Sequence, residues 1–428
     1  MARRAKARSG QVLATLLLLL GGGTPATAAT PAAAAAATAA TPTAAAAKAP
    51  ARAGGAPPPV WTGTWEAAPS GTAPGLAGTT IRNVVHTSVG GRALRVRLSN
   101  RLGTAPLRLG AVTVALRRPG GPGALPGSLR TAAFRGARTI TVPPGRDAVT
   151  DPVRLALPAA AELLVTVYTP GDPGPATYHR TALRTSYLAP GGDRTADEDG
   201  AAFTATTTHW YYVTGVDVLG APAAGSAVAL GDSLTDGTGS SRDADHRWPD
   251  RLAERLRALP PPRRLGVLNA GISGNRLLRD GVGPSALSRL DADALCRSGV
   301  RVLVVWEGIN DVNGTPAATG PAAFAAAYSR IVARAHAHGI RVVGATLTPY
   351  GGHSAYTPAR EAVRQAVNAL IRGGALFDAV ADFDAAVRDP SRPQRLRPAY
   401  DPGDHLHLND TGMRAVADTI DPAALGAG

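Results

Sequence analysis

Two patterns of apolar positions divide the chain. From residue 59 to about residue 220, short stretches in which apolar and polar residues alternate are separated by clusters of proline and glycine. From about residue 226 onward, short continuous apolar runs take turns with longer stretches of helical period. The first pattern predicts a mainly-β domain, a sandwich or jelly roll, because alternation with period two is typical of half-buried strands. The second predicts an α/β domain with a parallel sheet flanked by helices.

In the first region, residues 84–89 lead through Gly90 and Gly91 to residues 94–98, which predicts a β-hairpin around a two-glycine turn. Further strands are expected at 112–116, 139–142, 163–168 and 211–213. Three tryptophans admit two interpretations, sugar-stacking platforms or core packing, and core packing is favoured: Trp61, Trp65 and Trp210.

In the second region, strands are expected at 227–231, 265–269, 301–306, 341–346 and 377–383. Helices are expected at 248–259, 285–297, 321–338, 358–373 and 411–420. Pro321 near the start of one helix and Gly339 just past its end agree with the residue preferences of helix boundaries. Ligand sites of such parallel sheets lie at the carboxyl ends of the strands.

The amino terminus has the features of a secretory signal peptide. A basic segment precedes an apolar run at 12–20, which is too short to span a bilayer, and small residues at 26–28 suit a cleavage site. The expected organisation is therefore a signal peptide at 1–28, an Ala/Thr/Pro-rich linker at 29–57, a β-domain at 58–220 and an α/β domain at 221–428. No other run is long enough for a transmembrane helix, so the mature protein is expected outside the cell.

The net charge of +14 does not indicate nucleic-acid binding. The arginines are scattered along the chain, and no basic patch interleaved with aromatic residues is found. A single cysteine, Cys296, excludes an intrachain disulfide.

The first candidate catalytic residue follows the first apolar run of the α/β region. Leu230-Gly-Asp-Ser-Leu places Ser233 in a turn after a predicted strand, and Asp404 stands three residues before His407. A serine hydroxyl needs an imidazole to accept its proton and a carboxylate to orient that imidazole. These three residues supply one of each and predict a catalytic triad.

Two further motifs extend this into a family resemblance. Asn269-Ala-Gly-Ile-Ser-Gly and Gly308-Ile-Asn-Asp both follow predicted strands, and with the serine and histidine motifs they resemble the four blocks of the SGNH, or GDSL-type, esterases and lipases. The resemblance implies a flavodoxin-like parallel sheet, a Ser-His-Asp triad and no cofactor. It assigns the oxyanion hole to the backbone N–H groups of Ser233 and Gly271 and to the side-chain amide of Asn310. Motifs at 61–65, 86–91 and 98–100 resemble the β-domain of exported actinobacterial-type members.

Several alternatives remain open at this point. Ser233 can also be interpreted as a helix N-cap, and Ser273 is a rival nucleophile, although its Gly-Ile-Ser-Gly-Asn setting lacks the last glycine of a nucleophile elbow. Asp404, His405 and His407 can be interpreted as metal ligands instead. His353, in a loop after a predicted strand end, is a candidate for lining the substrate cleft.

The expected function is that of an exported serine esterase acting on a small-molecule or polysaccharide ester, with short acyl groups, acetyl above all, on carbohydrate. A lysophospholipase or lipase-like hydrolase is the alternative within the family. A carbohydrate-binding protein with an inactive hydrolase fold is the alternative from another class. The intact set of motif residues argues against the last of these.

Overall fold

The computed structural model describes residues 60–314 and 320–426, all of which belong to one compact unit. The predicted signal peptide and the linker at 29–57 lie outside these residues. Within the described ranges, no helix combines the length and apolar character that crossing a bilayer requires.

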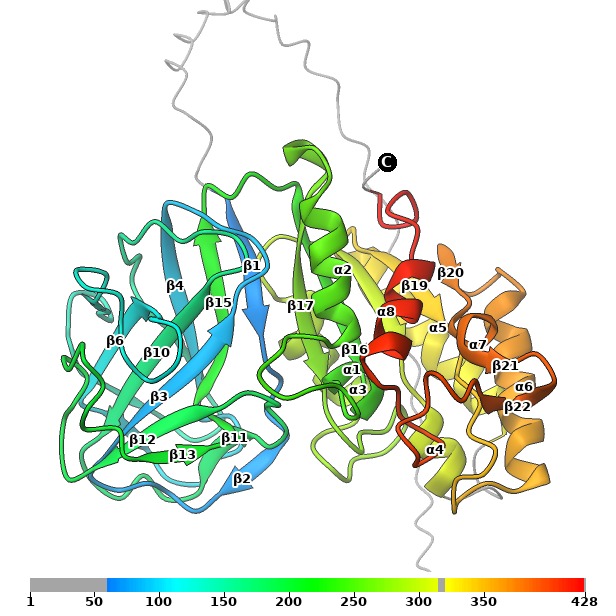
Figure 1. Cartoon of the computed structure of the whole chain (residues 1–428), viewed down its shortest axis with the longest axis horizontal. Coiled ribbons are helices and arrows are strands. Elements are labelled where there is room, and N and C mark those ends of the chain that lie inside the picture. The colour runs from blue at the N-terminus through cyan, green and yellow to red at the C-terminus, as the bar shows by residue number, and fades with distance from the viewer. Residues whose placement is uncertain (1–59, 315–319, 427–428) are drawn as a thin grey trace, which may run out of the picture. The chain divides into compact units, whose positions relative to one another are not determined.

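The amino-terminal part consists of antiparallel sheets, which confirms the predicted mainly-β domain (Figure 1). One sheet has the order β1 (Trp61–Glu66), β15 (Val213–Leu219), β4 (Ala93–Ser99) and β9 (Asp147–Val149). A second has the order β13 (Ala205–Thr207), β12 (Ser186–Pro190), β3 (Thr79–His86), β10 (Glu162–Thr169), β6 (Ala111–Leu116) and β7 (Arg130–Thr131). Smaller sheets join β14 (Trp210–Tyr211), β11 (Ala176–His179) and β2 (Gly71–Ala73), and β5 (Leu107–Leu109) with β8 (Ile140–Val142).

The hairpin predicted around Gly90 and Gly91 is wrong. Strand β3 pairs with β10 and β12, whereas β4 pairs with β15 and β9, so the two strands belong to different sheets. A two-residue hairpin turn of the common type needs positive φ at both central residues, and neither glycine has it. A Cβ on Gly90 would lie 2.3 Å from the carbonyl oxygen of Leu157, and one on Gly91 would lie 2.8 Å from that of Leu219. The two glycines therefore allow a close approach between backbones where the chain passes from one sheet to the next.

Two of the three tryptophans pack in the core of the β-domain. Trp65 and Trp210 are buried and meet edge to face, with ring centroids 5.0 Å apart, so they pack the core of the β-domain. Trp61 is only half-buried, and the guanidinium of Arg95 lies 4.4 Å from its ring centroid. Core packing is confirmed for the first two.

The carboxyl-terminal part contains a parallel sheet of five strands. Its order is β17 (Leu265–Gly271), β16 (Gly225–Gly231), β18 (Val300–Trp306), β19 (Arg341–Ala345) and β20 (Ala379–Ala381). Counted from the first strand, this is the 2-1-3-4-5 order of the flavodoxin-like fold, which confirms the predicted fold class. The strand order reverses between β16 and β18, and this switch point is where such sheets bind ligands.

The helices between the strands form two layers. Helix α2 (Trp248–Arg257) contacts α8 (Asp410–Thr419), and α5 (Pro321–Ala337) contacts both α3 (Ala286–Leu290) and α6 (Pro358–Arg372) (Figure 1). The helix predicted at 285–297 is divided, because a π-helical turn, Asp291–Leu295, follows α3. Short elements absent from the sequence expectation are α1 (Ser233–Asp236), α4 (Ile309–Gly314), α7 (Phe383–Val387), a 3₁₀ turn (Pro261–Arg263) and the pair β21 (Arg388–Asp389) and β22 (Arg392–Leu396).

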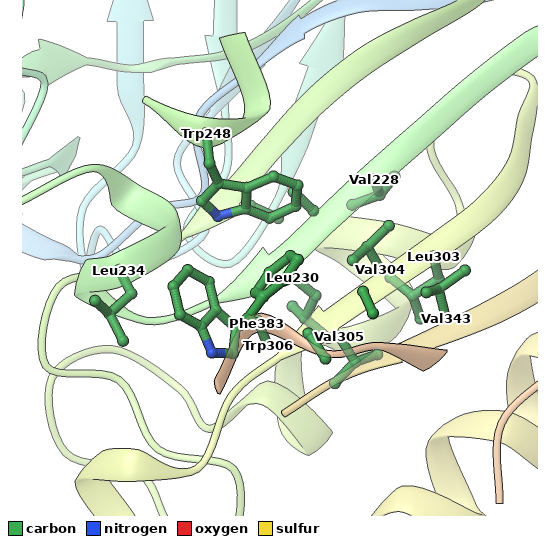
Figure 2. Close-up of a cluster of buried hydrophobic side chains, with 14 of the residues drawn as sticks. Val228, Leu230, Leu234, Trp248, Leu303, Val304, Val305, Trp306, Val343 and Phe383 are labelled. Atoms are coloured by element: carbon green, nitrogen blue, oxygen red, sulfur yellow. The ribbon is translucent and has the colours of Figure 1, made fainter. Parts of the chain in front are cut away.

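The core of the parallel sheet brings three aromatic side chains together. Trp306, at the end of β18, meets Phe383 edge to face with centroids 4.8 Å apart, and Trp248 lies 5.8 Å from the same phenyl ring (Figure 2). All three are buried. Because β18 ends in this cluster, the loop that follows it leaves the sheet from a rigid base.

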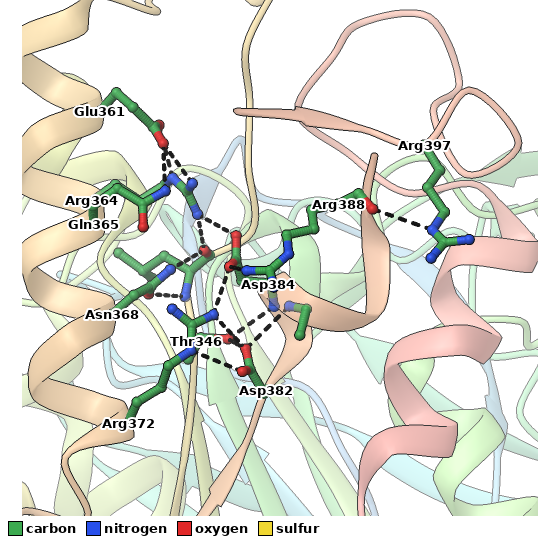
Figure 3. Close-up of polar contacts among 12 residues, drawn as sticks. Thr346, Glu361, Arg364, Gln365, Asn368, Arg372, Asp382, Asp384, Arg388 and Arg397 are labelled. Atoms are coloured by element: carbon green, nitrogen blue, oxygen red, sulfur yellow. Dashed lines mark hydrogen bonds and ion pairs between the residues drawn. The ribbon is translucent and has the colours of Figure 1, made fainter. Parts of the chain in front are cut away.

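A network of arginines and carboxylates ties α6 to α7 (Figure 3). Arg364 is fully buried and donates to Glu361, Asp384 and the carbonyl oxygen of Leu347. The carboxylate of Asp384 also accepts hydrogen bonds from Arg372 and Arg388. Every charge of the buried cluster therefore has a partner of opposite sign, as burial requires.

The β-domain and the α/β domain have separate hydrophobic cores but share backbone contacts. The Gly63 N–H donates to the Ser298 carbonyl at 2.9 Å, and the Val267 N–H donates to the Ser88 hydroxyl at 2.9 Å. A parallel bridge joins Ala67 to Asn269 in β17. The first strand of the β-domain therefore runs beside the outer strand of the parallel sheet.

Candidate active site

Ser233 lies directly after β16, as the first residue of α1. The N-cap position of that helix belongs to Asp232, whose side chain accepts a hydrogen bond from the Leu234 N–H. The N-cap interpretation of Ser233 is therefore wrong. Its hydroxyl is turned instead toward a histidine from the far end of the chain.

The Oγ atom of Ser233 lies 2.8 Å from Nε2 of His407. On the other side of the imidazole, Nδ1 lies 2.6 Å from Oδ2 of Asp404. A carboxylate accepts at Nδ1, so the proton of the neutral ring resides there and Nε2 is left to accept from the serine hydroxyl. The three residues predicted as a triad thus come together in the order and tautomer that nucleophilic catalysis requires.

Asp404 orients the His407 ring and also the backbone of the loop that contains it. One of its oxygens accepts from the backbone N–H groups of Leu406 and His407, at 3.0 and 2.9 Å. Partial burial works against ionisation, but the hydrogen bonds from the His407 side chain and from these two amides outweigh it and lower the pKa of Asp404. The carboxylate is therefore charged throughout the neutral range.

His405 has a different partner. Its Nδ1 lies 2.5 Å from Oδ2 of Asp401, and its backbone adopts a φ of 64°. His405 and His407 are thus bound to two separate carboxylates. In the described part of the chain, no group of three His, Cys, Asp or Glu side chains is arranged to hold a metal ion.

Gly271 lies at the end of β17, beside α1. A Cβ at this position would lie 2.2 Å from the backbone nitrogen of Asp236, so only glycine permits this contact. Its N–H, the second expected oxyanion donor, donates in this structure to Oδ1 of Asn269 at 2.9 Å. The amide of Asn269 donates in turn to the Thr235 carbonyl, which fixes β17 against the nucleophile helix.

Asn310 lies in α4, directly after β18, across the switch point from Ser233. Its amide nitrogen donates to the Asn275 carbonyl at 2.9 Å and lies 3.3 Å from Oδ2 of Asp232. The residue before the nucleophile thus contacts the third expected oxyanion donor. Sequence reasoning did not single out Asp232 or Asn275 for a role, although both lie inside the quoted motifs.

Buried carboxyl groups gather beneath this site. Burial, together with the charges of Asp311 and Asp236, raises the pKa of Asp232 to about 7. Burial and the neighbouring Asp232 raise the pKa of Glu307 well above its usual range. Among them lies Arg289, a buried cation that donates to the carbonyl oxygens of Gly231 and Ala270 and so holds the ends of β16 and β17 together.

The two remaining candidates occupy different positions. The Ser273 hydroxyl donates to Asp236 at 2.5 Å and contacts Thr238, so its hydrogen bonds do not include the histidine that a nucleophile needs. His353 is half-buried, and its pKa is lowered by burial and by the neighbouring His407 and His405, against the attraction of Asp404. It therefore lies close to the triad, and its place in a substrate cleft stays a prediction.

Comparison with known proteins gives one family. Residues 229–415 match the model of the GDSL-like lipase/acylhydrolase family. No curated protein matches the chain.

Solved structures similar to the chain include three hydrolases. The aryl esterase of M. smegmatis is 17% identical, with a TM-score of 0.36 over 45% of this chain and 94% of its own. An acetyl xylan esterase is 21% identical, with a TM-score of 0.35 over 45% and 96%. A GDSL-like lipase from Bacteroides thetaiotaomicron is 20% identical, with a TM-score of 0.35 over 47% and 88%.

Proposed function

We propose that this chain, which belongs to the GDSL-like lipase/acylhydrolase family through residues 229–415, is an exported serine esterase that removes short acyl groups from carbohydrate. Its class as a hydrolase follows from the family. The observation that carries its assignment as a serine esterase is the continuous hydrogen-bond chain from Ser233 through His407 to Asp404.

The proposed reaction has two halves. Nε2 of His407 takes the proton of Ser233 while Oγ attacks the ester carbonyl, and the same proton then passes to the departing alcohol. Water, deprotonated by His407, then attacks the acyl carbon; the bond to Oγ of Ser233 breaks, the proton passes from His407 to Oγ, and the carboxylic acid leaves. Asn310, with the backbone N–H groups of Ser233 and Gly271, stabilises the oxyanion; the Gly271 N–H must then share or exchange its bond to Asn269.

The preference for a short acyl group is supported by what surrounds the nucleophile. The side chains that make hydrogen bonds at or beside it are polar: Asp232, Thr238, Ser273, Asn310 and His407. A fatty chain gains about 0.8 kcal/mol for each methylene that it buries against apolar surface. These five side chains withhold that gain, which favours acetyl.

One observation favours the second candidate, an ester with an anionic alcohol part such as a lysophospholipid. A cavity of about 190 Å³ adjoins His405 and is lined by Arg392 and Arg395. Guanidinium groups recognise phosphate and carboxylate well. The same cavity would accept an acidic sugar in a polysaccharide.

Two assays test the proposal. Labelling by an alkyl fluorophosphonate, expected in the wild-type protein and absent from Ser233→Ala, separates an esterase from a carbohydrate-binding protein with an inactive fold. A series of para-nitrophenyl esters from acetyl to dodecanoyl, run beside acetylated xylan and lysophosphatidylcholine, then identifies the substrate class. Rates that climb steadily with chain length, without acetate release from xylan, would replace the carbohydrate assignment by the lipid one.

A further inference from the structure

The buried imidazole of His179 connects the β-domain to the nucleophile helix. His179 ends strand β11, and only 3% of its side chain is exposed. Its Nε2 lies 3.0 Å from Oδ1 of Asp236, the last residue of α1. The ring also faces Trp210, with centroids 5.4 Å apart.

Both nitrogens of this ring face oxygen atoms that can only accept. Nδ1 lies 2.7 Å from the Ala68 carbonyl, and Nε2 lies near the carboxylate of Asp236 and the carbonyl of Thr181. A neutral imidazole has a single N–H and would turn a lone pair toward one of these oxygens. The doubly protonated ring satisfies all of them. Burial opposes the charge, but Asp236 and these hydrogen bonds outweigh it and raise the pKa of His179.

The carboxylate of Asp236 also binds the loop that begins at Gly271, here called the oxyanion loop. Oδ2 of Asp236 accepts from the backbone N–H of Ser273 at 2.8 Å and from its hydroxyl at 2.5 Å. Ser273 lies two residues after Gly271, whose Cα packs against the backbone of Asp236 itself. One carboxylate therefore joins the nucleophile helix, the oxyanion loop and the β-domain.

We propose that His179 is a positioning residue for ester hydrolysis: through Asp236, it sets the position of the Gly271 loop relative to Ser233. The β-domain thereby completes the active site rather than serving as a detachable accessory. This inference rests on the function proposed above. Since the oxyanion develops only in the transition state, a displaced loop lowers kcat and leaves KM nearly unchanged.

The charged groups that face the pair belong to two other elements. Asp232 lies at the start of α1, and its charge and that of Asp236 repel each other. Arg247, buried at the N-cap of α2, is attracted by Asp236 and packs against Gly237. Asp236 therefore lies between an acidic neighbour, Asp232, and two basic ones, Arg247 and His179.

The test compares His179→Ala, His179→Gln and the control His209→Gln in the full chain. Gln retains one donor for Asp236. His209 lies in the same domain, and its ring bonds to the Arg180 carbonyl. With para-nitrophenyl acetate, kcat per active site, titrated by fluorophosphonate, is expected to fall on the order of 10- to 100-fold in His179→Ala with KM changed less than about threefold. His179→Gln is expected to recover most of the rate, and His209→Gln to equal the wild type.

Two results would overturn the inference. One is a His179→Ala protein whose kcat per titrated site stays within about twofold of the wild type. The other is a loss confined to the number of active sites, which would mean a role in folding alone. If His179→Ala folds poorly, kcat of His179→Gln, Asp236→Asn and their double variant decides instead: effects that multiply independently contradict the proposed coupling. Activity that survives in Ser233→Ala would instead refute the proposed function itself.

Discussion

Nε2 of His407 lies 2.8 Å from Oγ of Ser233, although 174 residues separate the two in sequence. The first follows the pair β21 and β22, and the second follows β16 at the switch point of the sheet. The contact therefore exists only in the completed fold. Most of the expected effects of substitution at the site follow from it.

Ser233→Ala is expected to abolish ester turnover and to leave the melting temperature close to that of the wild type. The lost hydroxyl is small, and the N-cap of its helix is supplied by Asp232. A residual rate of about 10³-fold above water is expected from the remaining oxyanion hole and substrate binding. Steady-state kinetics with thermal unfolding checks both parts, and near wild-type turnover would refute the assignment.

Asp404→Asn is expected to lower kcat on the order of 10⁴-fold, because an amide can donate to Nδ1 and so favours the wrong tautomer of His407. Asp401→Asn, the matched change at the partner of His405, is the control and should leave kcat within a few fold. A larger loss in the control than in Asp404→Asn would move the catalytic base to His405.

Activity is expected to rise with pH as His407 loses its proton, because the neutral imidazole is the base. The lowered pKa of Asp404 keeps its carboxylate charged across this range, so Asp404 should not contribute to the acidic limb of kcat/KM. His405→Gln should retain this limb, and His407→Gln should lose both the limb and the rate. Loss of the acidic limb of kcat/KM in His405→Gln would contradict the assignment of His407 as the base.

Asn310→Ala is expected to lower kcat by about 10²- to 10³-fold with a smaller effect on KM. The amide also bonds to the Asn275 carbonyl, so Asn310→Asp, which keeps the shape but removes the donor, serves as the second variant. A defect confined to KM in both proteins would mean that the residue binds ground-state substrate.

The buried carboxyl group of Glu66 is expected to make the free energy of unfolding depend on pH. Its complete burial, opposed by Arg297 at 2.6 Å, raises its pKa to about 8. The folded state therefore retains a proton that the unfolded chain releases near the ordinary pKa of 4.5, so the free energy of unfolding falls as pH rises from there to about 8. The slope is at most about 1.4 kcal/mol per pH unit. Denaturant unfolding of Glu66→Gln should show a flatter profile than the wild type, and an unchanged slope would contradict a neutral Glu66.

Arg364→Met is expected to destabilise the fold by about 3 kcal/mol, since it leaves buried carboxylates short of a partner. Arg372 and Arg388 remain on Asp384, which limits the loss. Arg372→Met, at a half-exposed position of the same network, should cost less. Below the melting temperature, kcat of both variants should match the wild type, because the network touches no reacting atom.

The sequence predicted the α/β half well because its signals are local. Each strand is rich in apolar residues, and Ser233, Gly271 and Asn310 lie at or just past strand ends, where sheet geometry alone brings them to one edge. The hairpin at Gly90 was wrong because glycine serves both turns and close backbone contacts, and the residue type alone does not distinguish them.

The contacts of the site that were not predicted mostly join residues that lie far apart in the sequence. His179 meets Asp236 across 57 residues and two domains, and nothing near either residue marks the pairing. Asn269 stood inside a motif, but its bonds to Thr235 and Gly271 depend on how β17 lies beside α1.

Strand β17 lies at the outer edge of the parallel sheet, and the β-domain covers that edge through Ser88 and through Ala67. An open edge strand offers unpaired N–H and C=O groups to other chains and promotes aggregation. A polypeptide cut at residue 221 would expose this edge, whatever happened to its triad. The amino-terminal sheets thus also protect the enzyme from self-association, and attempts to shorten it should begin elsewhere.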